Sequence, residues 1–221
     1  MSGNAVVIYS GGLDSTTLLY QLRDQGYEVK TLSVDYGQRH RQRESAAAAA
    51  ICDRLGVERR VVNLASLVDF LGKNSLSDHS VDVPEGRYKR SSMQVTTVPN
   101  RNMILVSVGI AWAISLQYDS VAFGAHGGRY SPYPDCQPAF AQAMHQAAGL
   151  CDWKKIAVLA PFVTWHKGDI VKRAAELGVP FELTWSCYKG GKTHCGRCGT
   201  CIDRREAFTK ADLVDPVEYA E

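Results

Sequence analysis

Short apolar runs alternate with amphipathic segments along the first 64 residues. Three runs rich in β-branched residues predict buried strands at residues 5–9, 28–34 and 57–64. Two segments with helical spacing lie between them, at residues 17–23 and 44–55, and each is followed by a glycine. The order strand, helix, strand, helix, strand predicts a parallel sheet covered by helices on both faces, the doubly wound α/β class.

The second part of the chain continues this alternation after an irregular stretch. Residues 72–99 have little periodicity and predict a long excursion from the sheet. Asn102 is a candidate cap for the apolar helix that follows. Beyond it we predict a helix at 103–118, a strand at 120–124, a loop at 125–138, a helix at 139–150, a strand at 155–159 and a helix at 167–177. The composition changes at residue 185, which predicts two parts: an α/β domain over 1–184, and a cysteine-rich segment with a C-terminal helix over 185–221.

Composition narrows the functional classes. The 221 residues carry a net charge of +2, which argues against holding nucleic acid mainly by neutralising phosphates. The longest uncharged run, residues 103–118, is shorter than the roughly 20 residues of a membrane span, and the N-terminus does not resemble a signal peptide. We therefore expect a cytoplasmic protein that uses its seven cysteines for metal binding or catalysis rather than for disulfides.

The motif Ser10-Gly-Gly-Leu-Asp-Ser-Thr16 follows the first predicted strand and precedes a helix. Glycines there allow close backbone approach, and the amides at a helix start form an anion site. The motif lacks the lysine of a Walker A loop and the spacing of a dinucleotide fingerprint. By itself, Ser-Gly-Gly also fits an ordinary tight turn, but the whole motif resembles the PP-loop of ATP pyrophosphatases, which predicts phosphate binding.

Four cysteines near the C-terminus have the spacing C-x7-C-x2-C-x2-C: Cys187, Cys195, Cys198 and Cys201. Four thiolates suit a closed, structural zinc site. An iron–sulfur cluster is the alternative, although the ferredoxin pattern would require a further cysteine where Arg205 stands. Cys52 and Cys151 are predicted to be small core residues. Cys136, in a loop rich in glycine and proline, is either a nucleophile or a pocket wall, although the pattern by itself favours an ordinary loop residue.

Five blocks in order resemble the QueC family of 7-cyano-7-deazaguanine synthases over nearly the whole chain. They are residues 10–16 (SGGLDST), 35–40 (DYGQRH), 98–103 (VPNRNM), 133–136 (YPDC) and 182–190 (ELTWSCYKG), the last leading into the cysteine cluster. The resemblance implies the adenine nucleotide alpha hydrolase-like fold, with structural zinc as cofactor and ATP with Mg²⁺ as co-substrate. It also implies conversion of 7-carboxy-7-deazaguanine and ammonium to the nitrile through adenylated carboxylate and amide intermediates. A homodimer is the implied assembly, without stably bound nucleic acid or membrane.

The resemblance also implies roles for individual residues. The ATP site would comprise Ile8, Tyr9, Ser10, Gly11, Gly12, Leu13, Asp14, Ser15, Thr16, Thr17 and Leu18. Arg101 would pair with a carboxylate or phosphate, and Lys167 would touch phosphate, although each also fits a charge on the surface of a helix. Tyr133 would stack on the base, while Asp135 would accept hydrogen bonds from its amino edge. His40 and His194 are expected to have ordinary surface roles.

Some positions depart from the family pattern. Gly127-Gly-Arg129, Gln137 and Ala139 stand where we expect an acidic residue, an arginine and a glutamate. Three alternatives therefore remain: a ligase that stops at the amide, another PP-loop adenylating enzyme, and a zinc-stabilised nucleotide-binding sensor without catalysis.

Overall fold

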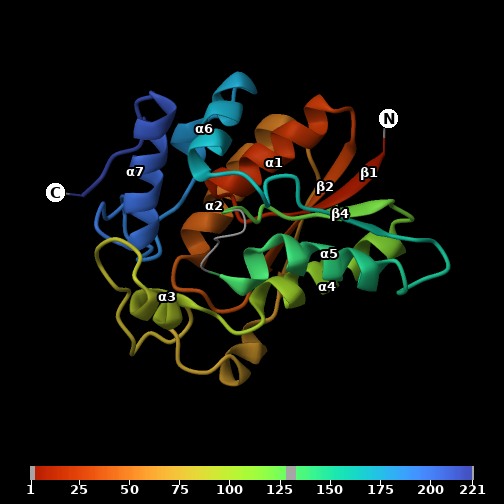
Figure 1. Ribbon diagram of the computed structural model, residues 1–221, viewed down its shortest axis with the longest axis horizontal. Coiled ribbons are helices and arrows are strands. Elements are labelled where there is room, and N and C mark those ends of the chain that lie inside the picture. The colour runs from red at the N-terminus through yellow and green to blue at the C-terminus, as the bar shows by residue number, and fades with distance from the viewer. Residues whose placement is uncertain (1–2, 128–132, 221) are drawn as a thin grey trace.

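The computed structural model describes residues 3–127 and 133–220, which form a parallel five-stranded sheet flanked by helices (Figure 1). The strands are β1 (Asn4–Ile8), β2 (Glu28–Asp35), β3 (Arg59–Asn63), β4 (Ser120–Ala122) and β5 (Ala157–Leu159). They lie in the order β3-β2-β1-β4-β5, and each neighbouring pair is parallel. The predicted fold class is confirmed.

Helices cover both faces of the sheet. They are α1 (Leu13–Asp24), α2 (Arg41–Leu55), α3 (Arg90–Thr96), α4 (Arg101–Ser115), α5 (Pro138–Ala148), α6 (Lys167–Glu176) and α7 (Gly199–Ala211). Buried residues of α1, α2 and α6 pack together on one face of β1, while those of α4 and α5 pack on the other. The winding of the chain therefore reverses between β1 and β4, and open parallel sheets bind ligands at such a switch point.

Several element boundaries differ from the sequence prediction. Helix α1 begins at Leu13, inside the glycine-rich motif, and the stretch predicted to be irregular contains α3. Asn102 is not the cap of α4, because Asn100 occupies the cap position and Asn102 lies in the first turn. The Asn102 side chain instead donates a hydrogen bond to the carbonyl oxygen of Asp135 at 3.1 Å. A tertiary contact has replaced the local one.

The C-terminal segment packs against α1 and α6 through buried contacts. Phe208 and Ala211 of α7 pack against Leu13 and Val171. The side chain of Arg204 is fully buried, donates to both carboxylate oxygens of Asp215 at 2.8 and 2.9 Å, and reaches Thr184 Oγ1 at 2.7 Å. The division of the chain at residue 185 stays a prediction. No helix in the described ranges is long and apolar enough to cross a membrane.

Candidate active site and metal centre

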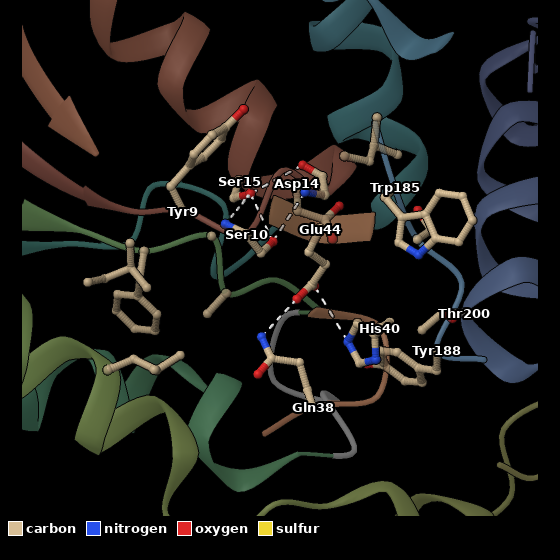
Figure 2. Close-up of a pocket in the computed structure, with 18 of the residues that line it drawn as sticks. Tyr9, Ser10, Asp14, Ser15, Gln38, His40, Glu44, Trp185, Tyr188 and Thr200 are labelled. Carbon is tan, nitrogen blue, oxygen red and sulfur yellow. Dashed lines mark hydrogen bonds and ion pairs between the residues drawn. The ribbon is translucent and has the colours of Figure 1, made fainter. Parts of the chain in front are cut away.

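An open cavity of about 920 Å³ lies where β1, β2 and β4 end. Its wall includes Tyr9 after β1, Asp35 at the end of β2 and Gly124 after β4. Residues from the start of α1 and from α7 complete it, so segments far apart in sequence face the same space (Figure 2). The cavity is therefore placed at the topological switch point of the sheet.

The glycine-rich turn forms part of this wall and is held close to α2. Gly11 has a φ of +78°, and a Cβ there would lie 2.6 Å from the backbone nitrogen of Ala48 and 2.7 Å from the carbonyl oxygen of Glu44. The hydroxyls of Ser10 and Ser15 lie 3.2 Å apart beside the start of α1 (Figure 2). Because the first amides of a helix lack partners within it, this turn gathers donors for an anion.

The predicted ATP-site residues divide between cavity and core. Those that line the cavity are Ile8, Tyr9, Ser10, Gly12, Leu13, Asp14 and Ser15. Thr16, Thr17 and Leu18 are fully buried beneath the turn. Thr16 lies 3.2 Å from the hydroxyl of Tyr9, and Thr17 donates to the carbonyl oxygen of Leu13 at 2.8 Å. These three residues support the turn from below.

Asp14 and Lys167 meet at the turn although 153 positions separate them. Lys167 Nζ lies 3.2 Å from Asp14 Oδ2 and 3.1 Å from Asp203 Oδ2, while His126 Nε2 lies 3.5 Å from the same Asp14 oxygen. Burial disfavours the Asp14 carboxylate, but Lys167 and His126 outweigh it and hold the Asp14 pKa well below its ordinary value. The surface alternative for Lys167 is therefore wrong: the side chain is largely buried and lines the cavity.

Asp14 Oδ1 is buried and has no hydrogen-bond partner among the described residues. An ionised carboxylate oxygen without a hydrogen-bond partner, beside groups that can donate hydrogen bonds to phosphate, is a suitable ligand for Mg²⁺, which prefers oxygen. The donor set at this turn therefore fits a magnesium ion carried in by a nucleotide.

Arg101 extends from the start of α4 into the cavity, near three tyrosines. Burial opposes its charge, but interactions with Tyr36 and Tyr188 raise the Arg101 pKa above its ordinary value. Tyr133 also lines the cavity, and its hydroxyl lies 3.1 Å from Thr96 Oγ1. Arg101 is thus a permanent cation among tyrosine rings. This combination suits an aromatic acid, since the cation can pair with the carboxylate while the rings contact the planar part.

Asp135, predicted to contact the substrate, lies outside the cavity, whereas Cys136 lies in its wall. Asp135 is not part of the cavity wall, and its Oδ2 accepts a hydrogen bond from the backbone of Asn102 at 3.4 Å. Cys136 does line the cavity. Burial, with the neighbouring Asp135 charge, raises the Cys136 pKa to about 11. A protonated thiol is a poor nucleophile, so the geometry favours the pocket-wall interpretation.

The four clustered cysteines converge on one point. Their sulfurs lie within 4.8 Å of one another, and all four residues are buried. Backbone amides donate toward these sulfurs, from Cys198 to Cys195 Sγ at 3.2 Å and from Cys195 to Cys187 Sγ at 3.4 Å. Four buried sulfurs with amide support fit a tetrahedral metal site. The group is therefore a candidate metal centre.

The metal centre is joined to the glycine-rich turn through Trp185. The backbone nitrogen of Trp185 donates to the carbonyl oxygen of Gly11 at 3.0 Å, and its indole donates to the carbonyl oxygen of Cys187 at 2.8 Å. Figure 2 shows Trp185 and Tyr188 facing the cavity beside α7. Hence one residue contacts both the turn and the cysteine segment.

Both histidines expected at the surface are buried. His40 stacks on Tyr188 with ring centroids 5.1 Å apart, and burial lowers its pKa. His194 Nε2 accepts a hydrogen bond from the backbone of Ser186 at 3.1 Å. Its ring packs against Trp185. The expectation of surface roles was wrong because each ring packs against another aromatic ring, which for His40 comes from a segment distant in sequence.

The remaining cysteines separate. Cys52 is buried against Thr31, as predicted. Cys151 is exposed, so its assignment to the core was wrong: it follows α5 in a turn, where its thiol donates to the carbonyl oxygen of Ala147. Of the departures from the family pattern, Gly128 and Arg129 lie outside the described residues, while Gln137 and Ala139 lie at the start of α5.

Sequence reasoning missed several cavity residues. Glu44 accepts a hydrogen bond from Gln38 at 3.2 Å and lies 3.6 Å from His40 (Figure 2). Asp203 and Tyr88 also line the cavity. Glu44 and Asp203 lie within helices, where a polar residue gives no sign of what it faces, so no local signal marks them.

The fold, the turn and its cavity define a PP-loop nucleotide-binding protein. Solved structures agree at the level of fold. A 4-thiouridine synthetase in complex with RNA and bound ATP superimposes with a TM-score of 0.54 at 17% identity, covering 95% of this chain and 50% of that one. The NMN synthetase of Francisella tularensis gives 0.50 at 16% identity, over 99% and 79%.

Sequence comparison is more specific. The family described as "Queuosine biosynthesis protein QueC" matches residues 4–212, and the chain belongs to that family. The 7-cyano-7-deazaguanine synthase of Methanoregula boonei is 47% identical over 215 residues, which cover 97% of this chain and 98% of the relative. The enzyme of the same name from Psychromonas ingrahamii is 41% identical over 221 residues, 100% of both chains.

Proposed function

We propose that this chain is a 7-cyano-7-deazaguanine synthase, a ligase that forms a nitrile from 7-carboxy-7-deazaguanine, ammonium and two molecules of ATP. One observation carries the proposal: a single cavity contains both a phosphate-binding turn with Lys167 and an Arg101 surrounded by tyrosines. Reaction between a nucleotide and an aromatic acid requires these two subsites to share one space. Membership of the QueC family supports the choice of acid.

The chemistry is activation of a poor leaving group. The carboxylate oxygen attacks the α-phosphate of ATP, giving an acyl adenylate and pyrophosphate, and ammonia then displaces AMP to form the amide. The amide oxygen attacks the α-phosphate of a second ATP and releases pyrophosphate, and loss of AMP together with both protons of the nitrogen gives the nitrile. Amides of the turn, the hydroxyls of Ser10 and Ser15, and Lys167 would hold the departing diphosphate. Asp14 would hold its Mg²⁺.

The proposed metal of the cysteine cluster is a structural zinc. Cys187, Cys195, Cys198 and Cys201 would bind it, and the ion would crosslink the segment that carries Trp185. Metal analysis of the purified protein should give one zinc per chain, and iron in its place would overturn this assignment.

One assay tests the reaction. The protein is incubated with ATP, ammonium and 7-carboxy-7-deazaguanine while AMP and the mass of the base are followed. The expected result is two AMP for each nitrile formed. Absence of AMP would overturn the proposal of an enzyme and favour a nucleotide sensor. AMP with the amide as final product would favour the ligase that stops at the amide.

Arg101 provides a test within the reaction. It would pair with the carboxylate, which the amide intermediate lacks, so Arg101→Gln should slow turnover of the acid more than turnover of added amide. Arg90→Gln, an exposed arginine at the start of α3, is the control. Equal effects on both substrates would show that Arg101 does not recognise the carboxylate.

We propose further that the protein is a cytoplasmic homodimer without stably bound nucleic acid. Light scattering tests the dimer.

A further inference from the structure

Tyr88 turns inward from an otherwise exposed stretch. Residues 85–87 and 89–91 are exposed, whereas Tyr88 is half-buried and lines the cavity. Its ring meets that of Tyr133 edge to face, with centroids 6.3 Å apart and planes at 89°. Burial raises the pKa of Tyr88 well above its ordinary value, so its phenol stays neutral. Tyr88 therefore presents an uncharged aromatic ring to the space beside Tyr133.

The backbone before Tyr88 is fastened to the cysteine segment by several contacts. The Glu85 carboxylate pairs with Lys189 and Arg197, and Glu85 forms an antiparallel bridge with Cys198. The amide of Gly86 donates to the carbonyl oxygen of Arg197 at 2.8 Å. The position of residues 85–88 is thus set by contacts with the cysteine segment rather than by contacts with the sheet.

Gly199 makes room for the Tyr88 ring. A Cβ at Gly199 would lie 2.7 Å from Tyr88 Cε1 and 2.9 Å from Cζ, closer than real Cβ atoms approach. Gly199 is the first residue of α7 and lies between Cys198 and Cys201. Alanine is a better helix former than glycine, so nothing local to α7 favours glycine here. The position of the ring and the absence of a side chain at residue 199 are complementary.

We propose that Tyr88 is a specificity-determining residue, whose ring forms one wall of the subsite for a planar heteroaromatic acid. The cysteine segment holds that ring in place through residues 85–87 and Gly199. This inference rests on the proposed function, since the ligand is the aromatic acid of that reaction. Aromatic side chains recognise planar rings by offset or edge contacts, which Tyr88 and Tyr133 offer together with the nearby Arg101 charge.

The experiment combines a truncation of the ring with an obstruction of its site. Tyr88→Ala should raise the Michaelis constant for 7-carboxy-7-deazaguanine by about tenfold, the loss of one aromatic contact, and leave that for ATP unchanged. Gly199→Ala should do the same by displacing the ring. Adding Gly199→Ala to Tyr88→Ala should have no further effect, because the obstructed ring is gone. Tyr88→Phe, which retains the ring, should restore affinity.

Gly191→Ala is the matched control in the same segment. Its nearest neighbour would be the carbonyl oxygen of Thr193 at an ordinary 3.6 Å. Unchanged metal content and melting temperature in each variant exclude a purely structural effect, and Gly199→Ala serves if Tyr88→Ala does not fold. The inference is overturned if neither variant changes the constant for the acid, or if both change the constant for ATP equally. Binding of the acid to the same variants can also be measured by calorimetry. This measurement tests the role of Tyr88 even if the wild type releases no AMP, which is the result that would contradict the proposed function.

Discussion

The Asp14 side chain is charged although it is largely removed from solvent. A carboxylate taken from water loses hydration, and nearby cations and hydrogen-bond donors recover that energy. Lys167 and His126 supply them, while Asp203 shares the Lys167 ammonium. The ammonium therefore bridges the glycine-rich turn and α7, at a position where added phosphate charge would also be attracted. The ion pairs of Lys167 therefore make it a suitable position for testing the proposed nucleotide site.

Lys167→Met should lower kcat/KM for ATP by about a hundredfold, because the phosphates lose a buried cation and the carboxylates lose their counterion. Steady-state kinetics with varied ATP measures this. Lys172→Met removes a lysine from the exposed side of the same helix and should leave the kinetics unchanged. A Lys167 variant that behaves like the Lys172 variant would show that the cation does not act on ATP.

Cys136 offers a prediction about pH. With a pKa near 11 the thiol is protonated at pH 7, and its thiolate fraction is roughly one in ten thousand. Cys136→Ser should therefore cost less than about tenfold in activity. Alkylation of Cys136 should be slow at pH 7 and accelerate as the pH approaches 11, while the exposed Cys151 serves as reference for peptide mapping. Abolished activity in the serine variant would support the nucleophile alternative.

At the scale of elements, the glycine-rich turn depends on α2 as much as on its own sequence. The close approach of Gly11 to the α2 backbone leaves no space for a Cβ, and α2 is rich in alanine where it faces the turn. Small side chains on α2 and glycine in the turn together bring two backbones into contact. The turn is consequently packed closely against α2, which suits a site whose donors must be positioned before the ligand arrives.

Two glycines with positive φ allow the energetic cost of backbone strain to be distinguished from the cost of a steric clash. Gly26→Ala should cost about 1 kcal/mol of unfolding free energy, since its φ is +81° but nothing lies within 4 Å. Gly11→Ala adds a backbone clash to similar strain and should cost about 3 kcal/mol and weaken ATP binding. Urea denaturation and nucleotide titration give both values. Equal costs for the two variants would mean that α2 yields readily.

At the scale of the molecule, the cysteine segment ties parts of the chain that the sheet leaves apart. Trp185 contacts Gly11, Arg204 contacts Thr184, and Glu85 contacts residues beside Cys198. Figure 1 shows α7 and this segment alongside α6, with the α3 region below them. The cysteine segment therefore contacts both the glycine-rich turn and the residues that precede Tyr88.

Removing the metal by chelation should lower the melting temperature by about 10 °C or more, because the segment loses its crosslink. Nucleotide affinity should fall as well, through Trp185. Thermal denaturation and ATP titration, before and after chelation and after zinc is restored, measure both effects. Cys198→Ser should make the protein insensitive to the chelator. Unchanged ATP affinity in the metal-free protein would show that the turn is independent of the metal centre.

The parallel sheet, the glycine-rich turn and the clustering of the cysteines were all predictable from the sequence. Each depends on local periodicity or on spacing within a short segment, so the residues that define it are neighbours in sequence. The start of α1 at Leu13 was missed because glycines and serines obscure helical periodicity.

Which distant residues share the site became clear only from the packing of the folded chain. Lys167 reaches both Asp14 and Asp203 because α6 and α7 pack beside the turn, and His40 is buried because the ring of Tyr188 comes to it from a distant segment. Tyr88 is the clearest case, since nothing in its polar surroundings in sequence indicates an inward ring. Burial and charge pairing arise from packing between segments, and local sequence patterns do not predict which segments will pack together.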